Sequence, residues 1–164
     1  MITQFFYPSP IGQIGIAENG RAVTHILLPG EAVPAGFIYK ETDLLIAAAD
    51  QLRSYFSGTL KTFCVPVEPE GTLFMRQVWS SLRKIPFGAT RSYKDIAVDI
   101  GNPRACRAVG QANNRNPIPI IIPCHRVISA NGKLVGYGGG LPVKTYLLDL
   151  EKRHACTENT LLNL

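Results

Sequence analysis

The sequence lacks a long hydrophobic run, and its first residues lack the features of a targeting segment. Of its 164 residues, 46% are hydrophobic and 18% are charged, which is ordinary for a globular chain that folds in water. No basic segment precedes an apolar stretch near Met1, and Pro8 and Pro10 would interrupt such a stretch. We therefore expect a cytoplasmic protein with neither a signal peptide nor a membrane span.

Cysteine and histidine are also scarce. The four cysteines, Cys64, Cys106, Cys124 and Cys156, include no Cys-x-x-Cys pair. This spacing argues against a zinc knuckle, a redox motif and a disulfide framework. No cysteine or second histidine lies near His25 in the sequence to hold a metal ion. We expect free thiols, no metal and no cofactor.

Positive charge is scarce in the first part of the chain and concentrated in the second. Residues 1–70 hold 4 Lys/Arg against 7 Asp/Glu, a net charge of −3, whereas residues 71–164 hold 13 against 5, a net charge of +8. A basic region favours a polyanionic partner, because contacts with phosphates release counterions. Charge alone leaves open the alternative of scattered, solvated side chains.

The first part of the chain has the pattern of an α+β domain. Three short β-prone segments, 2–7, 13–17 and 22–28, are separated by turn signals, which predicts a hairpin or a meander. Apolar residues then recur at helical spacing over 42–57, and Gly58 stands where a helix often ends in glycine. This region contains no candidate catalytic residues.

A linker separates this region from a second one. Segment 65–71 combines proline, glycine and acidic residues, which continue neither a helix nor a strand. We therefore predict two domains, 1–69 and 70–164. The second domain is expected to open with a helix over 73–82, in which Trp79 belongs to the core.

Two further helices are predicted around a glycine turn. Ser92-Tyr93-Lys94-Asp95 has the form of a capping box that opens a helix to Ile100, and Gly101 would end it. Asn102-Pro103 would supply the N-cap and the N1 proline of a second helix to about Ala112. Two helices joined by a tight turn form a helix-turn-helix, which favours DNA binding in a basic region.

The second of these helices is expected to display small residues and two arginines, namely Arg104, Ala105, Arg107, Ala108, Gly110 and Ala112. Small side chains let a helix approach a backbone closely, which suits shallow contact with phosphates and the minor groove. Reading base edges in the major groove would more naturally use Asn, Gln or several Arg. The alternative is a helix that packs against another helix through its alanines.

An apolar run that ends on a cysteine is the most distinctive stretch. Asn116–Ile122 carries isoleucines typical of a buried segment, and Pro123 fixes the backbone just before Cys124. His125 and Arg126 follow, and both can stabilise the thiolate, which is the reactive form of cysteine. Because adjacent residues rarely face each other, we expect a bridging water between Cys124 and His125. The alternative is a buried cysteine that only packs.

Three motifs together resemble a known family. Pro123-Cys124-His125-Arg126-Val127, preceded by Asn116-Pro117 and followed by Gly136-Tyr137-Gly138-Gly139-Gly140-Leu141, is similar to the active-site region of the O6-alkylguanine-DNA alkyltransferases. The resemblance extends without a gap from about Phe74 to Glu151. It implies a ribonuclease-H-like α+β domain followed by a mainly helical, winged helix-turn-helix domain that binds DNA.

The resemblance also implies a reaction. Members of this family repair DNA directly: they flip an alkylated base out of double-stranded DNA and transfer its alkyl group to one of their own cysteines. The transfer is irreversible, so each molecule acts once, and no metal or cofactor takes part. The expected substrate is O6-alkylguanine, with O4-alkylthymine as a second candidate, and the expected state is a monomer.

Catalytic roles carry over residue by residue. The resemblance implies that Cys124 is the nucleophile, that His125 removes its proton through a water, and that Glu151 orients this histidine. Tyr93 is expected to press on a phosphate and to donate a hydrogen bond toward the departing guanine. Because Glu151 is distant from His125 in the sequence, a solvent-exposed Glu151 is the alternative.

The resemblance implies that a further set of residues contacts the base, namely Asn116, Val127, Tyr137, Gly138, Gly139 and Lys144. Asn116 would brace the turn of the site, and the backbone carbonyls of Cys124 and Val127 would accept from the guanine amino group. Tyr137 and the Gly138 amide are expected near O6, because a backbone amide approaches a base most closely where no Cβ intervenes. The alternative is a glycine loop that is merely flexible.

The residues expected to contact DNA are Tyr93, Arg104, Ala105, Arg107, Ala108, Arg115 and Arg126. Arg107 would enter the space that the flipped base leaves. Two other functions stay open from the sequence. A relative that binds alkylguanine without reacting would lack Cys124, and a Cys/His hydrolase would need an oxyanion hole and a histidine that is not adjacent in the chain.

Two departures from the family pattern concern the base pocket. Animal members have a serine where this chain has Gly138, which favours the hypothesis of a roomier pocket that accepts alkyl groups larger than methyl. Asn113 stands where some relatives place an apolar residue against the base. The N-terminal zinc ligands of some relatives have no counterpart in this sequence.

Overall fold

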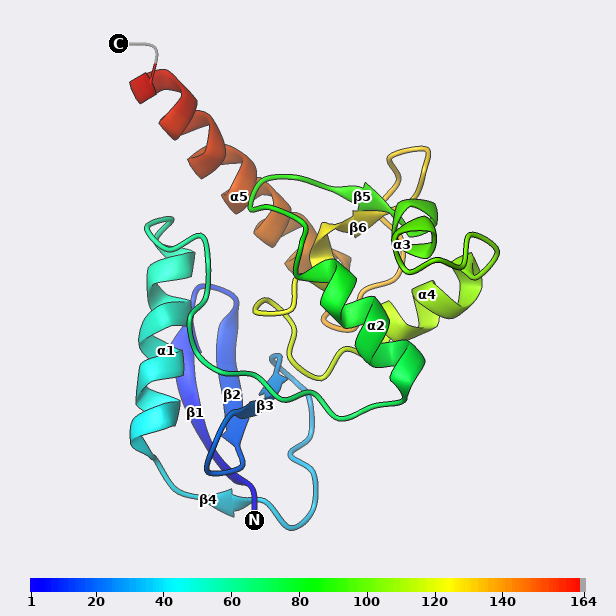
Figure 1. Cartoon of the computed structure of the whole chain (residues 1–164). Helices are drawn as coiled ribbons and strands as arrows, with labels where there is room; N and C mark the ends of the chain where they lie inside the picture. Colours follow the sequence, from blue (N-terminus) through cyan, green and yellow to red (C-terminus); the bar gives the residue numbers. More distant parts are fainter. Residues whose placement is uncertain (163–164) are drawn as a thin grey trace. The chain divides into compact units, whose positions relative to one another are not determined.

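The chain forms two compact units (Figure 1). The structure is a computed structural model that describes the backbone of residues 1–162 and the side chains up to Ala155, so the free thiol predicted at Cys156 lies outside the described side chains. The first unit comprises Met1–Glu70 together with Pro117–Ile121, and the second comprises the rest of the chain. Helices and sheets occur together, which confirms the predicted α+β class.

Four strands form the sheet of the first unit: β1 (Thr3–Ser9), β2 (Gly12–Glu18), β3 (Val23–Leu27) and β4 (Ile38–Tyr39). Their order in the sheet is β3-β2-β1-β4. The first three form the predicted antiparallel meander, whereas β4 runs parallel to β1 at the edge. The sequence did not predict β4, because two residues are too few for an alternating pattern.

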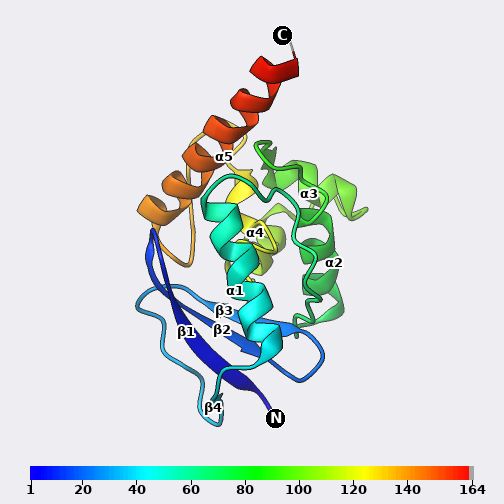
Figure 2. The same ribbon diagram turned by 90° about the vertical axis from the view of Figure 1, so that its left-hand side faces the viewer.

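Helix α1 (Asp43–Phe56) lies along one face of this sheet (Figures 1 and 2). Thr42 caps its first turn by accepting a hydrogen bond from the Leu45 amide, and Gly58 adopts a φ of +82° just beyond its end, as predicted. Its buried side chains recur at helical spacing and pack over β1 and β2 as the core of the unit: Leu45, Ala48, Ala49, Leu52, Tyr55 and Phe56.

The isoleucine run belongs in part to the first unit. The Ile26 amide on β3 donates to the Pro117 carbonyl over 2.9 Å. Ile118 and Ile120 are fully buried, which confirms that the run is a buried segment. Ile120 has a φ of +74°, a conformation that β-branched residues rarely adopt, so the surrounding packing must hold this backbone in place.

Three helices form the body of the second unit: α2 (Leu73–Leu82), α3 (Tyr93–Asp99) and α4 (Cys106–Asn114). Helix α2 has the bounds that the sequence predicts. Trp79 is buried, and its indole N–H donates to the Ala112 carbonyl over 2.9 Å, which ties α2 to α4. The prediction that Trp79 belongs to the core is confirmed.

The predicted capping box at the start of α3 is confirmed. The Ser92 hydroxyl accepts from the Asp95 amide over 3.0 Å, and the Asp95 carboxylate accepts from the Ser92 amide over 2.9 Å. Helix α3 ends at Asp99, one residue before the predicted end, and Gly101 follows with a φ of +79°.

The predicted start of the next helix is wrong. The Ala105 amide donates to the Asn102 carbonyl and closes a tight turn, so Asn102 caps no helix. Helix α4 begins at Cys106 and has no side-chain cap. Arg104 and Ala105 therefore precede the helix, and Ala112 is buried rather than displayed on its surface.

A short parallel sheet connects α3 to the cysteine motif. Strand β5 (Arg91–Ser92) leads into α3, and β6 (Val127–Ile128) follows the 3₁₀ turn η1 (Cys124–Arg126). Arg91 pairs with Val127, so the start of α3 lies beside the end of the turn that carries Cys124. Helix α5 (Leu141–Leu162) closes the chain.

The described residues also bear on the expectations about thiols, metals and membranes. Cys64, Cys106 and Cys124 are free thiols. Among the residues that the structure describes, no group of three or more His, Cys, Asp or Glu side chains is placed to hold a metal ion. No helix in this part of the chain is long and apolar enough to cross a membrane.

Candidate active site

Cys124 lies at the first position of the 3₁₀ turn, at the end of the buried isoleucine run. Its amide donates to the Ile122 carbonyl over 2.8 Å, and the Arg126 amide donates to the Pro123 carbonyl over 3.0 Å. These bonds close the tight turn that carries the thiol. Cys124 is 4% exposed, so the thiol lies in the protein interior.

Burial makes this thiol a weak acid. Loss of solvent raises the pKa of Cys124 to about 11, although a hydrogen bond from Asn116, the charge of Lys144 and nearby backbone amides act to lower it. At neutral pH the sulfur therefore holds its proton. A reaction of Cys124 as a nucleophile requires a base to remove that proton.

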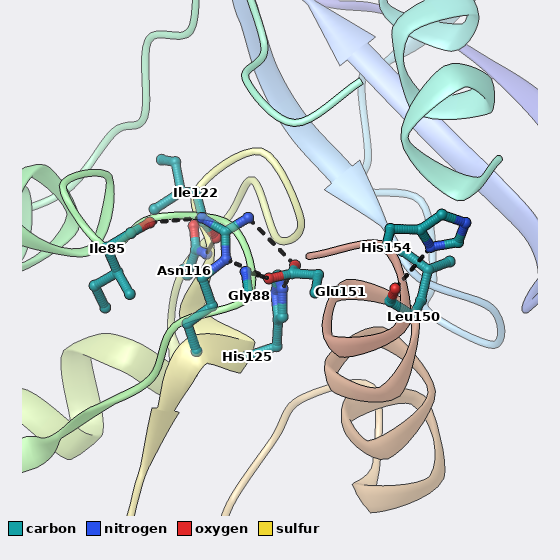
Figure 3. Close-up of polar contacts among 9 residues, drawn as sticks. Ile85, Gly88, Asn116, Ile122, His125, Leu150, Glu151 and His154 are labelled. Atoms are coloured by element: carbon teal, nitrogen blue, oxygen red, sulfur yellow. Dashed lines mark hydrogen bonds and ion pairs between the residues drawn. The ribbon is translucent and has the colours of Figure 1, made fainter. Parts of the chain in front are cut away.

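His125 is a base of the required kind, because it is buried and neutral. Loss of solvent lowers the pKa of His125, and the neighbouring Glu151 only partly opposes this shift. Nε2 of His125 is hydrogen-bonded to the Glu151 carboxylate (Figure 3). Since a carboxylate accepts the Nε2 proton, the lone pair of the ring is on Nδ1, where it can receive a proton.

Glu151 is held ionised in the interior, on helix α5. Its carboxylate accepts from the Gly88 amide over 3.1 Å and from Nε of Arg126 over 2.8 Å, as well as from His125. Burial alone would raise the pKa of Glu151, but the hydrogen bonds and charges of His125 and Arg126 lower it to about 2. The alternative of a solvent-exposed Glu151 is excluded.

The expectation that Arg126 contacts DNA is wrong. The residue is 6% exposed, and Nη1 donates to the Ile85 carbonyl over 2.7 Å while Nε and Nη2 donate to Glu151. The guanidinium also lies 5.8 Å from the centre of the Phe87 ring. Arg126 balances the charge of Glu151 inside the protein and is not available to a phosphate.

Lys144 and Tyr93 meet at one backbone carbonyl near the sulfur. Nζ of the fully buried Lys144 donates to the Val127 carbonyl over 2.7 Å and to the Val135 carbonyl over 3.3 Å. The Tyr93 hydroxyl donates to the same Val135 carbonyl over 3.0 Å. Burial lowers the pKa of Lys144 and raises that of Tyr93, and a charge on Cys124 acts on both groups.

The glycine segment, residues 136–140, approaches Asn114 at the end of α4. Gly136 has a φ of +57°, and a Cβ there would lie 3.3 Å from Nδ2 of Asn114. Gly138 has no such constraint, because a Cβ would lie 3.8 Å from its nearest neighbour, the Asn114 carbonyl. Tyr137, between them, is half-buried. The backbone therefore favours glycine at 136, whereas position 138 leaves room for a side chain.

Two asparagines hold the backbone around Cys124. Nδ2 of Asn116 donates to the Ile122 carbonyl over 2.7 Å (Figure 3), which agrees with the expectation that Asn116 braces this turn. Nδ2 of Asn113, at the end of α4, donates to the Cys124 carbonyl over 3.3 Å. Sequence reasoning did not predict the bonds made by Asn113, Gly88 and Ile85, because each joins segments that are distant along the chain.

The other residues expected to contact DNA lie on the surface around α4. Arg107 and Ala108 are exposed on the helix, and Arg104 is exposed just before it. Ala105 is partly exposed at the N-cap, and Arg115 is exposed at the C-cap. The structure therefore leaves these side chains accessible to a partner, in contrast to Arg126.

The two parts of the chain match two family models. Residues 2–69 match the ribonuclease-like domain of 6-O-methylguanine DNA methyltransferase, and residues 73–153 match its DNA-binding domain. Cys124, His125 and Glu151 all lie within the second match. The fold is thus the two-domain alkyltransferase fold.

Individual relatives are similar over nearly the whole chain. The methylated-DNA–protein-cysteine methyltransferase of Methanosarcina barkeri is 52% identical over 150 residues, which cover 89% of this chain and 94% of that protein. The protein of that name from Mycobacterium leprae is 45% identical over 157 residues, which cover 94% and 95%. A crystal structure of Mycobacterium tuberculosis OGT in complex with DNA matches with a TM-score of 0.89 at 45% identity and covers 93% and 94% of the two chains. The chain belongs to the 6-O-methylguanine DNA methyltransferase family.

Proposed function

We propose that this protein repairs double-stranded DNA by moving the alkyl group of O6-alkylguanine onto Sγ of its own Cys124. The observation that carries the proposal is a buried relay. A thiol with a pKa of about 11 is followed in the chain by a neutral His125, and an ionised Glu151 fixes that histidine. A water between Sγ and Nδ1 of His125 completes the path for the proton.

Transfer begins with loss of the thiol proton. His125 accepts this proton at Nδ1, and the resulting imidazolium is stabilised by the Glu151 carboxylate at Nε2. The positive charge of Lys144 and the backbone amides of the turn stabilise the thiolate, because each of them lowers the pKa of Cys124.

The thiolate then displaces guanine. A bond forms between Sγ and the alkyl carbon as the bond from that carbon to O6 breaks, and the electron pair of the broken bond passes into the guanine ring. The Tyr93 hydroxyl, which donates to the Val135 carbonyl without substrate, turns to donate toward this ring, and the proton that guanine finally gains balances the one that the thiol lost. The thioether product has no easy leaving path, so each molecule acts once.

DNA contact is assigned to the exposed surface around α4. Arg104, Arg107 and Arg115 supply positive charge there, and Ala108 lets the helix approach the sugar-phosphate backbone closely. The base must leave the duplex to reach a buried thiol, and Arg107 fills the space that it leaves. One monomer acts on one lesion. A reducing cytoplasm suits the reaction, because oxidation would consume the thiol.

Stoichiometry tests the proposal. Purified protein is mixed with an excess of duplex oligonucleotide containing one O6-methylguanine, and the restored guanine is quantified over time. We expect repair to stop at one equivalent per protein molecule and to be absent in Cys124→Ala. Repair that continues beyond one equivalent would overturn the proposal in favour of a hydrolase, and binding without repair would favour a sensor.

A further inference from the structure

Asn113 is a buried polar residue that has no role in the proposed mechanism. It lies at the end of α4 and is 2% exposed. Nδ2 donates to the carbonyl of Cys124 over 3.3 Å. A carbonyl only accepts hydrogen bonds, so this contact fixes the orientation of the amide: the nitrogen faces Cys124, and Oδ1 is on the other branch.

The other half of this amide lacks a partner. Oδ1 of Asn113 is buried, and none of the residues that the structure describes donates a hydrogen bond to it. A buried acceptor without a donor is costly and uncommon in folded proteins, so each instance calls for an explanation. Because one carbon joins Oδ1 to Nδ2, the unpaired oxygen lies beside the backbone of Cys124.

The proposed substrate carries one kind of donor that could reach this oxygen. Alkylation at O6 leaves N1 of guanine without a proton, and N3, N7 and O6 only accept hydrogen bonds. The 2-amino group is therefore the sole donor on the base. It is also the group expected to bond to the Cys124 carbonyl, beside which Asn113 lies.

We propose that Oδ1 of Asn113 accepts a hydrogen bond from the 2-amino group of the flipped O6-alkylguanine, which makes Asn113 a specificity-determining residue. The inference rests on the proposed function. It also predicts a preference between lesions: O4-alkylthymine presents a carbonyl oxygen instead of an amino group, and two facing acceptors repel each other. Asn113 thus favours guanine lesions over thymine lesions.

The test compares two bases that differ by this amino group. Single-turnover rate constants are measured on matched duplexes containing O6-methylguanine or O6-methylhypoxanthine, which lacks the 2-amino group, for the parent and for Asn113→Leu. We expect the parent to favour O6-methylguanine and the ratio of the two rates to fall about tenfold in the variant. Differences in base-pair opening belong to the DNA, so they cancel when the ratios of the two proteins are compared.

Two further variants control for effects on folding. Gln77→Leu makes the same kind of change, an amide to a leucine, at an exposed position on α2, and we expect it to keep the substrate ratio of the parent. Asn113→Ala repeats the test with a smaller side chain if Asn113→Leu does not fold. The rate constant on O4-methylthymine, divided by that on O6-methylguanine, should be higher in both variants at position 113 than in the parent.

The outcomes separate the inference from the proposed function. A parent that transfers no methyl group from any lesion overturns both. A parent that transfers normally but reacts equally with the two purines overturns the role of Asn113 alone. The same conclusion follows if the variants at position 113 slow both reactions by the same factor, because Asn113 would then only support the backbone of Cys124.

Discussion

The two sides of the candidate active site differ in how the buried Glu151 carboxylate and the buried Asn113 amide are paired. On the relay side, formed by Gly88, His125, Arg126 and Glu151, the Glu151 carboxylate accepts hydrogen bonds from the three other residues. On the side proposed to receive the base, called the base side and formed by Asn113, Val135 and residues 136–140, Oδ1 of Asn113 is buried and has no donor among the residues that the structure describes. The Glu151 carboxylate is thus paired without substrate, whereas we propose that the substrate pairs the Asn113 oxygen.

This difference has a physical reason. A buried charge costs several kcal/mol unless it is paired at all times, so the protein must satisfy Glu151 by itself. A neutral amide oxygen costs less to leave unpaired, so it can be kept for a ligand. Changes on the relay side should therefore reduce both stability and rate, and changes on the base side should mainly alter the choice of substrate.

The largest expected effect is on rate, at His125. Replacing His125 with Ala removes the base, so we expect the transfer rate at pH 7 to fall by about 10² to 10⁴. The variant should recover as the pH rises toward the thiol pKa of about 11, because hydroxide then replaces the base. Single-turnover kinetics from pH 6 to 10 measure this. A variant whose deficit is the same at every pH would show that His125 is not the base.

Glu151→Gln should reduce both stability and rate. The substitution leaves the buried Arg126 without its counterion and His125 without a carboxylate, so we expect a loss of about 3–5 kcal/mol in the free energy of unfolding. Urea denaturation measures this loss. Asp149→Asn, at an exposed position on the same helix, is the matched control and should change stability by less than about 0.5 kcal/mol. Equal effects of the two substitutions would contradict the account of the relay side.

Acid should weaken the pairing of Glu151 and thereby destabilise the fold. The folded pKa of Glu151, about 2, lies below its ordinary value of 4.5, so its contribution is full above about pH 5 and is lost as the pH falls toward 2. The lowered pKa of His125 acts in the same direction, because protonation below about pH 6.5 favours the unfolded chain. We expect Glu151 to account for about 3 kcal/mol of acid destabilisation. A Glu151→Gln variant with the same pH dependence as the parent would exclude this.

Lys144 lies between the two sides, so its replacement should have an intermediate effect. In Lys144→Met, the carbonyls of Val127 and Val135 lose a donor, and the thiol loses a nearby positive charge. We expect the thiol pKa to rise further and its alkylation by iodoacetamide at pH 8 to slow about tenfold. Peptide mass spectrometry measures labelling at Cys124 apart from Cys64 and Cys106. Unchanged labelling would show that the charge of Lys144 does not affect the pKa of the Cys124 thiol.

The smallest effect on folding is expected at Gly138. A Cβ at this position would lie 3.8 Å from its nearest neighbour, so Gly138→Ser should change stability by less than about 0.5 kcal/mol. The added side chain should lower the rate of benzyl transfer relative to methyl transfer, by less than about tenfold. Single-turnover rates of benzyl and methyl transfer give this ratio. Equal ratios in the parent and the variant would contradict the hypothesis of a roomier pocket.

Local signals in the sequence predicted local structure well. The bounds of α2, the capping box at Ser92 and the helix end at Gly58 all follow from interactions within a few residues. The start of α4 was predicted wrongly, because Asn102-Pro103 suits both a helix start and a tight turn. Only the surrounding packing decides between the two.

Contacts between distant segments were harder to predict. The bond between His125 and Glu151 was expected only from the family resemblance, since no pattern in this chain joins a 3₁₀ turn to helix α5. Arg126 was expected to contact DNA, and its burial became apparent only from its bonds to Glu151 and Ile85. The unpaired oxygen of Asn113 is a property of three-dimensional packing and has no signature in the sequence.

One measurement tests the central claim most directly. The parent and Cys124→Ala are each mixed with an equimolar duplex oligonucleotide containing one O6-methylguanine, and intact and peptide masses are recorded. The proposed reaction predicts a gain of one CH2 group per molecule, confined to the peptide that contains Cys124 and absent from the variant. A gain on another peptide, or an unchanged mass while the DNA is repaired, would contradict transfer to Cys124.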